Sequence, residues 1–334
     1  MILVTGGTGL IGSHLLFHLI SNGNKVRSNY RTKESIDKVH NVFGYYTDNP
    51  SDLVEQIDWV RADITNLGGL DSLFDGISQV FHCAALISFD PKDFKALERT
   101  NVEGTANIVN LSLKHKVKKL CYVSSIAAIG PSLKQKEITE ETEWLETKAS
   151  VYGITKYEAE LEVWRASQEG LSVVIVNPGV VIGPGFWKSG SGTFFSYAAK
   201  GKKYYIPGGT GFVSVHDVIK AMTMLMASEI KTERFILVGQ NMTYGELFKK
   251  IAPKLGVEPP DRKVSKFMLE LFWRLDWARS HLFGKRRRLS RIMAKGLYQQ
   301  QTYSNRKIRS QLDFTFADLD KAIAFCCDKF MTKN

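Results

Sequence analysis

The stretch Val4-Thr5-Gly6-Gly7-Thr8-Gly9-Leu10-Ile11-Gly12 decides the fold, because it joins a short apolar run to the start of a helical pattern. Glycine at positions 6, 9 and 12 permits a sharp turn, a close approach of the backbone to a pyrophosphate, and tight packing of a helix on a strand. The N-terminus of that helix offers N–H groups to the phosphates. A G-x-G-x-x-G pattern in a strand–turn–helix context therefore predicts a dinucleotide site formed by Gly6, Thr8, Gly9, Leu10, Ile11 and Gly12.

Short apolar runs alternate with helical patterns from the N-terminus to Pro178. The expected strands are Ile2–Val4, Lys25–Asn29, Ile57–Arg61, Gln79–Cys83, Lys119–Ser124 and Ser172–Asn177. The helical patterns between them cover Ile11–Asn22, Leu67–Phe74, Phe94–His115 and Tyr152–Glu169. This alternation predicts an α/β protein with a Rossmann-like, doubly wound parallel sheet that is covered by helices on both faces.

The pattern loosens after Pro178. Loops are expected at residues 183–185 and 188–192, and helices at Val215–Ser228, Thr243–Leu255, Ser265–Phe283, Ser290–Tyr298 and Phe316–Phe330. We therefore expect residues 1–178 to form a nucleotide-binding domain, to which residues 213–240 return. Residues 179–212 and 241–334 are expected to form a smaller, mostly helical C-terminal lobe that binds the substrate.

The composition is that of a globular protein, with 44% hydrophobic and 24% charged residues in a chain of 334. It excludes a disordered chain and a disulfide-rich miniprotein. The formal charge of +11 is concentrated, because residues 262–309 hold 14 basic and two acidic residues.

No apolar run reaches the roughly 18 residues that span a bilayer. A strand that starts at Ile2 leaves no room for a signal peptide, so we expect a cytoplasmic protein with four reduced cysteines.

The end of the second expected strand indicates which nicotinamide cofactor is bound. An acidic residue at this place would accept hydrogen bonds from the adenosine ribose and repel a 2′-phosphate. The sequence instead has Arg31 and Lys33, with no carboxylate until Glu34. These two cations are suited to a 2′-phosphate, so NADP(H) is favoured over NAD(H). The alternative is a pair of solvated loop cations.

Three polar residues form a candidate reaction centre. Tyr152 and Lys156 are four residues apart at the start of a helix and therefore share a face. A phenol has a pKa of about 10, and a nearby ammonium favours the phenolate, so the pair can exchange a proton with a substrate hydroxyl or carbonyl. Ser125 adds a hydroxyl at the end of the fifth strand, where ligands of parallel sheets bind. No cluster has metal-ligand spacing, and no metal is expected.

The sequence resembles the extended short-chain dehydrogenase/reductase family, which includes the NAD(P)-dependent epimerases and dehydratases. The resemblance rests on the glycine loop, the serine at a strand end and the Y-x-x-x-K pair, which follow one another in this order along the chain. Further matching motifs are Asp63-Ile64, His82-Cys83-Ala84-Ala85, Asn101-Val102-Glu103-Gly104-Thr105 and Asn177-Pro178-Gly179. The resemblance implies that Tyr152 is the acid/base, that Ser125 orients the substrate oxygen, and that Lys156 holds the nicotinamide ribose and lowers the pKa of the tyrosine. It also implies a structural role for Asn101 and cofactor contacts at Asp63, Ile64, Ala84, Ala85, Leu86, Ser124, Pro178, Gly179 and Val181.

Within this family, the stretch from Tyr122 to Pro131 is most similar to the 3β-hydroxysteroid dehydrogenase and dihydroflavonol 4-reductase branch. This likeness implies hydride transfer between the nicotinamide and a secondary alcohol or ketone of a small, apolar, dihydroflavonol- or steroid-like substrate. Sugar-nucleotide 4,6-dehydratases carry an Asp-Glu pair where this chain has Ile126 and Ala127, which argues against a dehydratase. A nucleotide-sugar 4-epimerase with tightly bound NAD(P) is the alternative. A non-catalytic dinucleotide sensor ranks last, because the triad is complete.

The basic segment at residues 262–309 permits several interpretations. Lys285-Arg286-Arg287-Arg288 has the composition of a nucleic-acid patch, but no nucleic-acid module surrounds it, so no nucleic-acid partner is expected. The aromatic-rich stretch from Phe267 to Trp277 is favoured as a helix packed over the substrate pocket. A peripheral contact with an anionic membrane through residues 262–309 is the second interpretation, and the two are compatible. A homodimer is left open.

Overall fold

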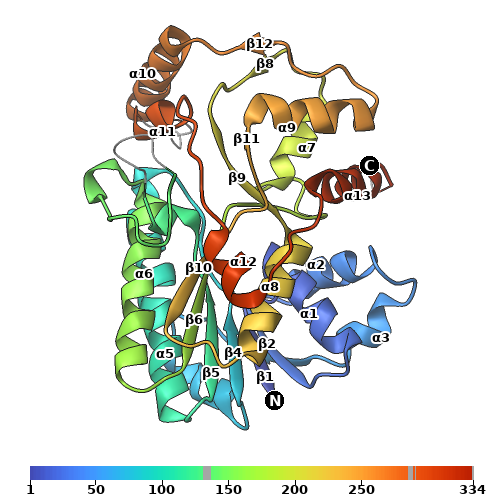
Figure 1. Cartoon of the computed structure of the whole chain (residues 1–334), viewed down its shortest axis with the longest axis vertical. Helices are drawn as coiled ribbons and strands as arrows, with labels where there is room; N and C mark the ends of the chain where they lie inside the picture. The colour runs from blue at the N-terminus through green and yellow to red at the C-terminus, as the bar shows by residue number, and fades with distance from the viewer. Residues whose placement is uncertain (131–136, 285–288, 290, 333–334) are drawn as a thin grey trace.

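The computed structural model describes residues 1–130, 137–284, 289 and 291–332; the basic run Lys285–Arg288 lies outside the described residues. Its centre is a seven-stranded sheet in the order β10-β6-β5-β4-β1-β2-β3, in which every neighbouring pair is parallel (Figure 1). The strands are β1 (Ile2–Thr5), β2 (Val26–Tyr30), β3 (Asp58–Arg61), β4 (Gln79–His82), β5 (Lys119–Val123), β6 (Val173–Pro178) and β10 (Glu233–Leu237). The predicted Rossmann-like sheet is thereby confirmed.

Both faces of the sheet are buried, as the Val- and Ile-rich runs predict. In β6, Val173 and Ile175 pack into one hydrophobic cluster, whereas Val174 and Val176 pack into another. The first cluster includes residues of α5 (Gly104–Lys114) and α6 (Val151–Gln168), and the second includes residues of α1 (Leu10–Ser21) and α8 (Val215–Ala227). Each strand therefore anchors a helical layer on either side, and the strand ends are held at one edge.

The helices of the first half depart from the expected pattern in four places. Residues Phe94–His115 form α4 (Phe94–Leu97), a π-helical turn (Glu98–Glu103) and α5 rather than one regular helix. The expected helix at Leu67–Phe74 is two short 3₁₀ turns, because two glycines and an aspartate interrupt the pattern. The sequence reading missed α2 (Glu34–Phe43) and α3 (Pro50–Val54), which are short and polar on one face.

The lobe above the sheet is less helical than expected. Strands β7 (Val180–Ile182), β9 (Gly209–Ser214) and β11 (Gln240–Thr243) form a small sheet, and β8 (Tyr204–Tyr205) pairs with β12 (Arg262–Lys263). These strands are too short, or too rich in glycine, for a period of two to be visible in the sequence. The helices of the lobe are α7 (Gly192–Ala198), α9 (Tyr244–Ile251), α10 (Lys266–Phe283), α11 (Arg291–Gly296) and α13 (Leu319–Met331). Helix α12 (Arg306–Leu312) lies beside β10 instead (Figure 1), and its Ile308 is buried in the core of the main sheet.

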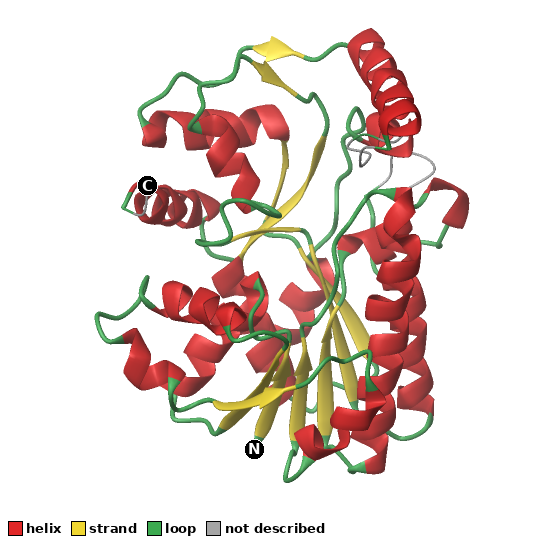
Figure 2. Cartoon of the chain, turned by 180° about the vertical axis from the view of Figure 1, so that it is seen from behind, coloured by secondary structure: helices red, strands yellow, loops and turns green. Residues whose placement is uncertain are grey.

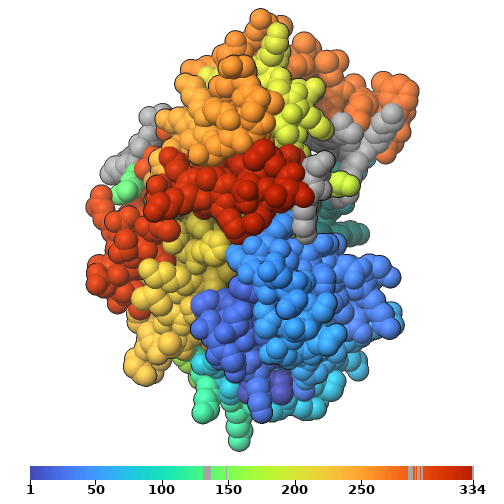
Figure 3. Space-filling view, turned by 90° about the vertical axis from the view of Figure 1, so that its right-hand side faces the viewer, coloured from blue at the N-terminus to red at the C-terminus, as the bar shows by residue number. Residues whose placement is uncertain are grey.

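Helix α13 lies at the junction between the lobe and the α1–α2 side of the sheet, as Figures 2 and 3 show. Its Phe325 ring centre is 5.8 Å from that of Tyr46 and 6.0 Å from that of His216. Its Cys326 and Cys327 are buried in the core of the lobe, and all four cysteines of the chain are free thiols, as expected. Among the described residues, no helix has the length and apolar character that crossing a bilayer requires.

Candidate active site

The residues singled out in the sequence follow the carboxyl ends of neighbouring strands. Because all of these strands are parallel, their carboxyl ends meet at one edge of the sheet, where ligands of such sheets bind. The sites are Gly6–Gly12 after β1, Arg31 and Lys33 after β2, Asp63 and Ile64 after β3, Ala84–Leu86 after β4, Ser124 and Ser125 after β5, and Pro178 and Gly179 at the end of β6. Topology therefore places these segments along one side of the molecule.

The glycine loop has the conformation and the close contacts that a phosphate cradle needs. Gly6 has φ +70°, and a Cβ atom there would lie 2.5 Å from the Ala84 nitrogen, so a larger residue would push the loop away from the segment after β4. Gly9, the N-cap of α1, supplies no side-chain hydrogen bond to the first turn, which leaves those N–H groups suited to an anion. The buried Ser124 hydroxyl has no hydrogen-bond partner among the described residues. These features fit a dinucleotide, whose nicotinamide would supply the hydride acceptor or donor.

The residues that are expected to bind the adenosine half of the cofactor are less fully prepared for a ligand than the glycine loop is. Arg31 and Lys33 are exposed beyond the end of β2. The Asp63 carboxylate accepts hydrogen bonds from the Thr65 N–H and hydroxyl, both at 2.9 Å, and so caps its own turn. Val181 packs against the hydrophobic cluster that contains residues of α1 and α8. Asn29, which the sequence reading missed, accepts a hydrogen bond from Gly6 N at 3.4 Å and links β2 to the glycine loop.

Helix α6 carries Tyr152 and Lys156 to the end of β5. It begins at the N-cap Ser150, whose hydroxyl accepts a hydrogen bond from Gly153 N at 3.1 Å. A Cβ atom on Gly153 would lie 2.8 Å from the Ala127 carbonyl oxygen, so only glycine allows α6 to approach the turn that follows Ser125. The close approach brings the first turn of α6 against the strand-end serine.

Ser125 and Tyr152 form a pair of neighbouring hydroxyl groups. The Ser125 hydroxyl oxygen accepts a hydrogen bond from Ala127 N at 3.1 Å, and the same hydroxyl is close enough to the Tyr152 oxygen to stabilise its phenolate form. Burial raises the pKa of Tyr152 to about 12, although the hydrogen bond from Ser125 acts in the opposite direction. The phenol is therefore protonated at neutral pH and is equipped to donate a proton.

The side chain of Lys156 reaches the end of β5, and its effect on the pKa of Tyr152 stays a prediction. Its buried ammonium donates to the Tyr122 hydroxyl and, at 2.9 Å, to the Val123 carbonyl oxygen. Burial lowers the pKa of Lys156 to about 7, and the nearby Glu160 carboxylate opposes this shift. The ammonium is therefore held by β5 and by the Tyr122 hydroxyl, and burial is the largest cause of the raised pKa of Tyr152.

A buried series of hydrogen bonds and one ring stack joins Lys156 to the end of β1, next to the glycine loop. The ring of Tyr122 lies 4.2 Å from the Lys156 ammonium and is stacked on His82, with ring centres 5.4 Å apart. His82 is hydrogen-bonded to Thr5 at 2.6 Å and to Thr105 at 3.0 Å. In the sequence, Tyr122 looks like an ordinary aromatic residue of a buried strand, and only its position two residues before Ser124 hints at this role.

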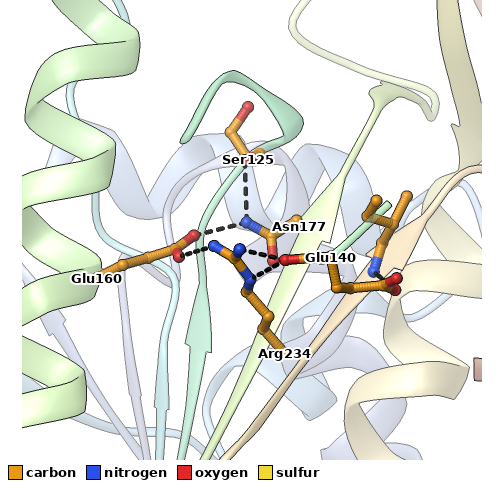
Figure 4. A network of polar contacts seen from close by, with 6 residues as sticks. Ser125, Glu140, Glu160, Asn177 and Arg234 are labelled. Atoms are coloured by element: carbon orange, nitrogen blue, oxygen red, sulfur yellow. Dashed lines mark hydrogen bonds and ion pairs between the residues drawn. The ribbon is translucent and has the colours of Figure 1, made fainter. Parts of the chain in front are cut away.

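A second buried network supports Ser125 from below (Figure 4). The Asn177 amide donates to the Ser125 carbonyl oxygen at 3.0 Å and to Glu160 at 2.6 Å. Glu160 pairs with Arg234 at 3.3 Å, and Arg234 in turn donates to the Glu140 carbonyl oxygen at 3.0 Å. Sequence reasoning missed Glu160, Arg234 and Glu140, because they belong to three separate elements and form no motif.

The loop after β4 brings an aromatic side chain against Tyr152. Asn101, on the π-helical turn, accepts a hydrogen bond from Leu86 N at 2.7 Å and donates to Leu86 O at 3.0 Å, which fixes the start of the loop after β4. The same loop exposes Ile87 and Phe89, and the ring centre of Phe89 is 5.7 Å from that of Tyr152. The surroundings of the phenol are therefore aromatic and aliphatic. No group of three His, Cys, Asp or Glu side chains in the described part of the chain is placed to hold a metal.

Substitution of Tyr122 by phenylalanine is expected to move the alkaline limb of the kcat/KM pH profile to lower pH by about one unit. The variant removes an oxygen that accepts from the Lys156 ammonium, so the charged form loses stabilisation and the pKa of Lys156 falls further below its ordinary value. Activity that requires the ammonium would then be lost at a lower pH. Tyr157→Phe, which changes a tyrosine stacked on Trp144, should leave the profile in place. An unshifted profile in a folded Tyr122→Phe protein would contradict this role.

Known proteins resemble the chain in sequence and in fold. The sequence profile of the NAD dependent epimerase/dehydratase family matches residues 2–239. A Synechocystis protein named "Putative dihydroflavonol 4-reductase" is 32% identical over 78% of this chain and 74% of its own, and tetraketide alpha-pyrone reductase 2 of Arabidopsis thaliana is 28% identical over 79% and 85%. The crystal structure of gox2253 superposes with a TM-score of 0.83 at 25% identity, covering 100% of this chain and 98% of the other.

Proposed function

Because the chain belongs to the NAD dependent epimerase/dehydratase family, we propose that it reduces the carbonyl group of a small apolar ketone with NADPH. The family and the relatives of this chain are NAD(P)-dependent reductases, epimerases and dehydratases of the extended short-chain type, as the motifs predicted. The chain is therefore an NAD(P)-dependent enzyme, and the proposal concerns its reaction direction, its cofactor preference and its substrate class.

The buried, protonated phenol of Tyr152 carries the proposal. Reduction delivers a hydride to the carbonyl carbon and needs a proton for the carbonyl oxygen, and a phenol with a pKa of about 12 holds that proton at neutral pH. Tyr152 would donate it, and the Ser125 hydroxyl would then stabilise the phenolate that forms. The Lys156 ammonium would hold the cofactor ribose and favour the same phenolate. The product is a secondary alcohol.

The apolar nature of the substrate is supported by Phe89, which contacts Tyr152, and by Ile87 of the same loop. Ile87 and Phe89 are exposed in the structure, and such side chains gain free energy when an apolar ligand covers them. A dihydroflavonol- or steroid-like ring system would meet this surface, and a relative named as a dihydroflavonol 4-reductase is consistent with it. The division into a cofactor domain and a substrate lobe, a cytoplasmic location and a homodimer stay predictions.

Consumption of NADPH that depends on a ketone tests the proposal. Purified protein should oxidise NADPH in the presence of at least one member of a panel of dihydroflavonols, ketosteroids and aromatic ketones, and it should form the matching alcohol. Interconversion of UDP-glucose and UDP-galactose without net oxidation of added cofactor would favour the 4-epimerase instead. No turnover of either kind by protein that binds NADPH would favour the sensor and defeat the proposal.

Substitution of Arg31 by alanine is expected to weaken NADPH binding by about 10- to 100-fold and to leave NADH binding unchanged. The proposed partner of its guanidinium is the 2′-phosphate, which NADH lacks. Dissociation constants for both cofactors, measured by fluorescence titration, check this expectation. Lys38→Ala removes another exposed cation nearby on α2 and should alter neither constant. An NADPH preference that survives in Arg31→Ala would defeat the assignment of this residue.

A further inference from the structure

Helix α10 has an apolar stripe on its outer side. Phe267, Leu271, Leu275 and Leu282 recur at helical spacing and are 76, 43, 57 and 74% exposed. The opposite side of the helix holds its buried residues, Leu269 and Ser280. Figures 1 and 2 show α10 at the edge of the lobe, with no other drawn element on its outer side. A large continuous apolar stripe at a surface is characteristic of an interaction site.

The charges around this stripe are mostly positive. Residues 262–284 contain two acids, and each is paired within the helix, Glu270 with Arg274 and Asp276 with Arg279, both at 2.7 Å. Exposed cations that flank the start of the helix are Arg262, Lys263 and Lys266. A second copy of this surface would meet like charges, whereas a layer of lipid phosphates offers the complementary charge.

Another side of the same helix lines a pocket together with the loop after β4. Trp277, Ser280 and His281 line a pocket of about 350 Å³, whose other wall is Asp90, Pro91 and Lys92 of the loop after β4. The Lys92 ammonium donates to the Ser280 hydroxyl at 3.1 Å and so joins loop to helix. Phe89, next to this wall, contacts the ring of Tyr152. The stripe and the pocket therefore belong to one helix, and the pocket wall adjoins the residue that contacts Tyr152.

We propose that the outer stripe of α10 (Phe267, Leu271, Leu275 and Leu282) docks the enzyme on the surface of an anionic lipid bilayer. The apolar side chains enter the boundary between headgroups and acyl chains, and the flanking cations contact lipid phosphates. The pocket then opens at the membrane, from which an apolar ketone can pass to Tyr152. This last step rests on the proposed function, but binding to lipid does not.

Vesicle binding of the purified full-length chain tests the proposal without any turnover. Flotation is measured with phosphatidylcholine vesicles that contain about 40% phosphatidylglycerol and with vesicles of phosphatidylcholine alone. The expected partition coefficient is about 100-fold higher on the anionic vesicles, because several cations each add to the attraction, and it should fall as salt is raised. Equal partition on both vesicles, or no partition on either, would overturn the proposal.

A variant of the stripe separates lipid docking from other causes. Phe267→Ser/Leu271→Ser/Leu275→Ser is expected to bind anionic vesicles about 30-fold more weakly. The matched control Leu67→Ser/Leu161→Ser/Met331→Ser removes three exposed apolar side chains elsewhere and should bind like the original chain. Both variants should keep the original Tm and cofactor affinity. Undiminished vesicle binding by the stripe variant would defeat the proposal, as would a dimer that the stripe variant converts to monomers.

Discussion

Substitution of Tyr152 by phenylalanine is expected to lower kcat for ketone reduction by about 1,000-fold or more. The variant keeps the ring that contacts Phe89 but removes the proton that the carbonyl oxygen must receive, and water has restricted access to this buried position. The loss should fall on kcat rather than on KM, because the hydroxyl acts on the charge that develops in the transition state. Single-turnover measurements of NADPH oxidation give the rate of the chemical step directly.

Two comparisons make the Tyr152 result specific. Cofactor affinity should be nearly unchanged in Tyr152→Phe, which shows that the glycine loop is intact. Ser125→Ala should lose less, about 10- to 100-fold, because it removes a donor to the phenol oxygen and leaves the proton in place. If Tyr152→Phe retains more than a tenth of the original kcat, another group supplies the proton and the proposed chemistry is wrong.

Substitution of Arg234 by methionine is expected to reduce the free energy of unfolding by about 3–5 kcal/mol. Glu160 is 1% exposed, so loss of the guanidinium leaves its carboxylate buried without an opposing charge. The Glu140 carbonyl oxygen also loses a donor. Because this network holds the Ser125 backbone through Asn177, activity should fall as well. Thermal unfolding should show a Tm lower by about 10 °C.

The charge explanation for Arg234 is checked by a double variant. Adding Glu160→Gln to Arg234→Met removes the uncompensated carboxylate and should recover part of the lost stability. Arg165→Met breaks ion pairs with Glu162 and Glu169 on the exposed side of α6 and should cost about 1 kcal/mol or less. An Arg234→Met protein that unfolds at the original temperature would show that the buried pair contributes nothing.

The sequence predicted the first six strands of the sheet to within a residue or two, and the signal is clearest in β1, β5 and β6, which are rich in Val, Ile and Leu. It missed β10, which begins with Glu233 and Arg234 and follows a long excursion through the lobe. Arg234 is also the residue that completes the network below Ser125. The periodicity of hydrophobic residues within a short segment does not reveal a strand that forms only by pairing with a segment far away in the sequence. The sequence therefore predicted neither β10 nor the role of Arg234.

The candidate site was predictable where residues lie at strand ends or at fixed helical spacing. Ser125 and Tyr152 come together because a strand end and a glycine at position 153 bring α6 close. The partner of Lys156 was not predictable, since helical spacing places its side chain on the same face as Tyr152 but does not say which oxygen it binds. Burial and the Tyr122 hydroxyl decide that contact.

The position of β10 at the edge of the sheet also shapes how the chain folds. Strand β6 is buried along its whole length and pairs on one side with β10, which the ribosome completes only after β7, β9 and α8. During synthesis β6 therefore presents an apolar, unpaired edge for as long as it takes to make the intervening chain. Closing this pair is a late step between distant parts of the chain, which slows folding. We therefore expect the nascent chain to aggregate, or to bind a chaperone, chiefly in the period after β6 has been made and before β10 has been made.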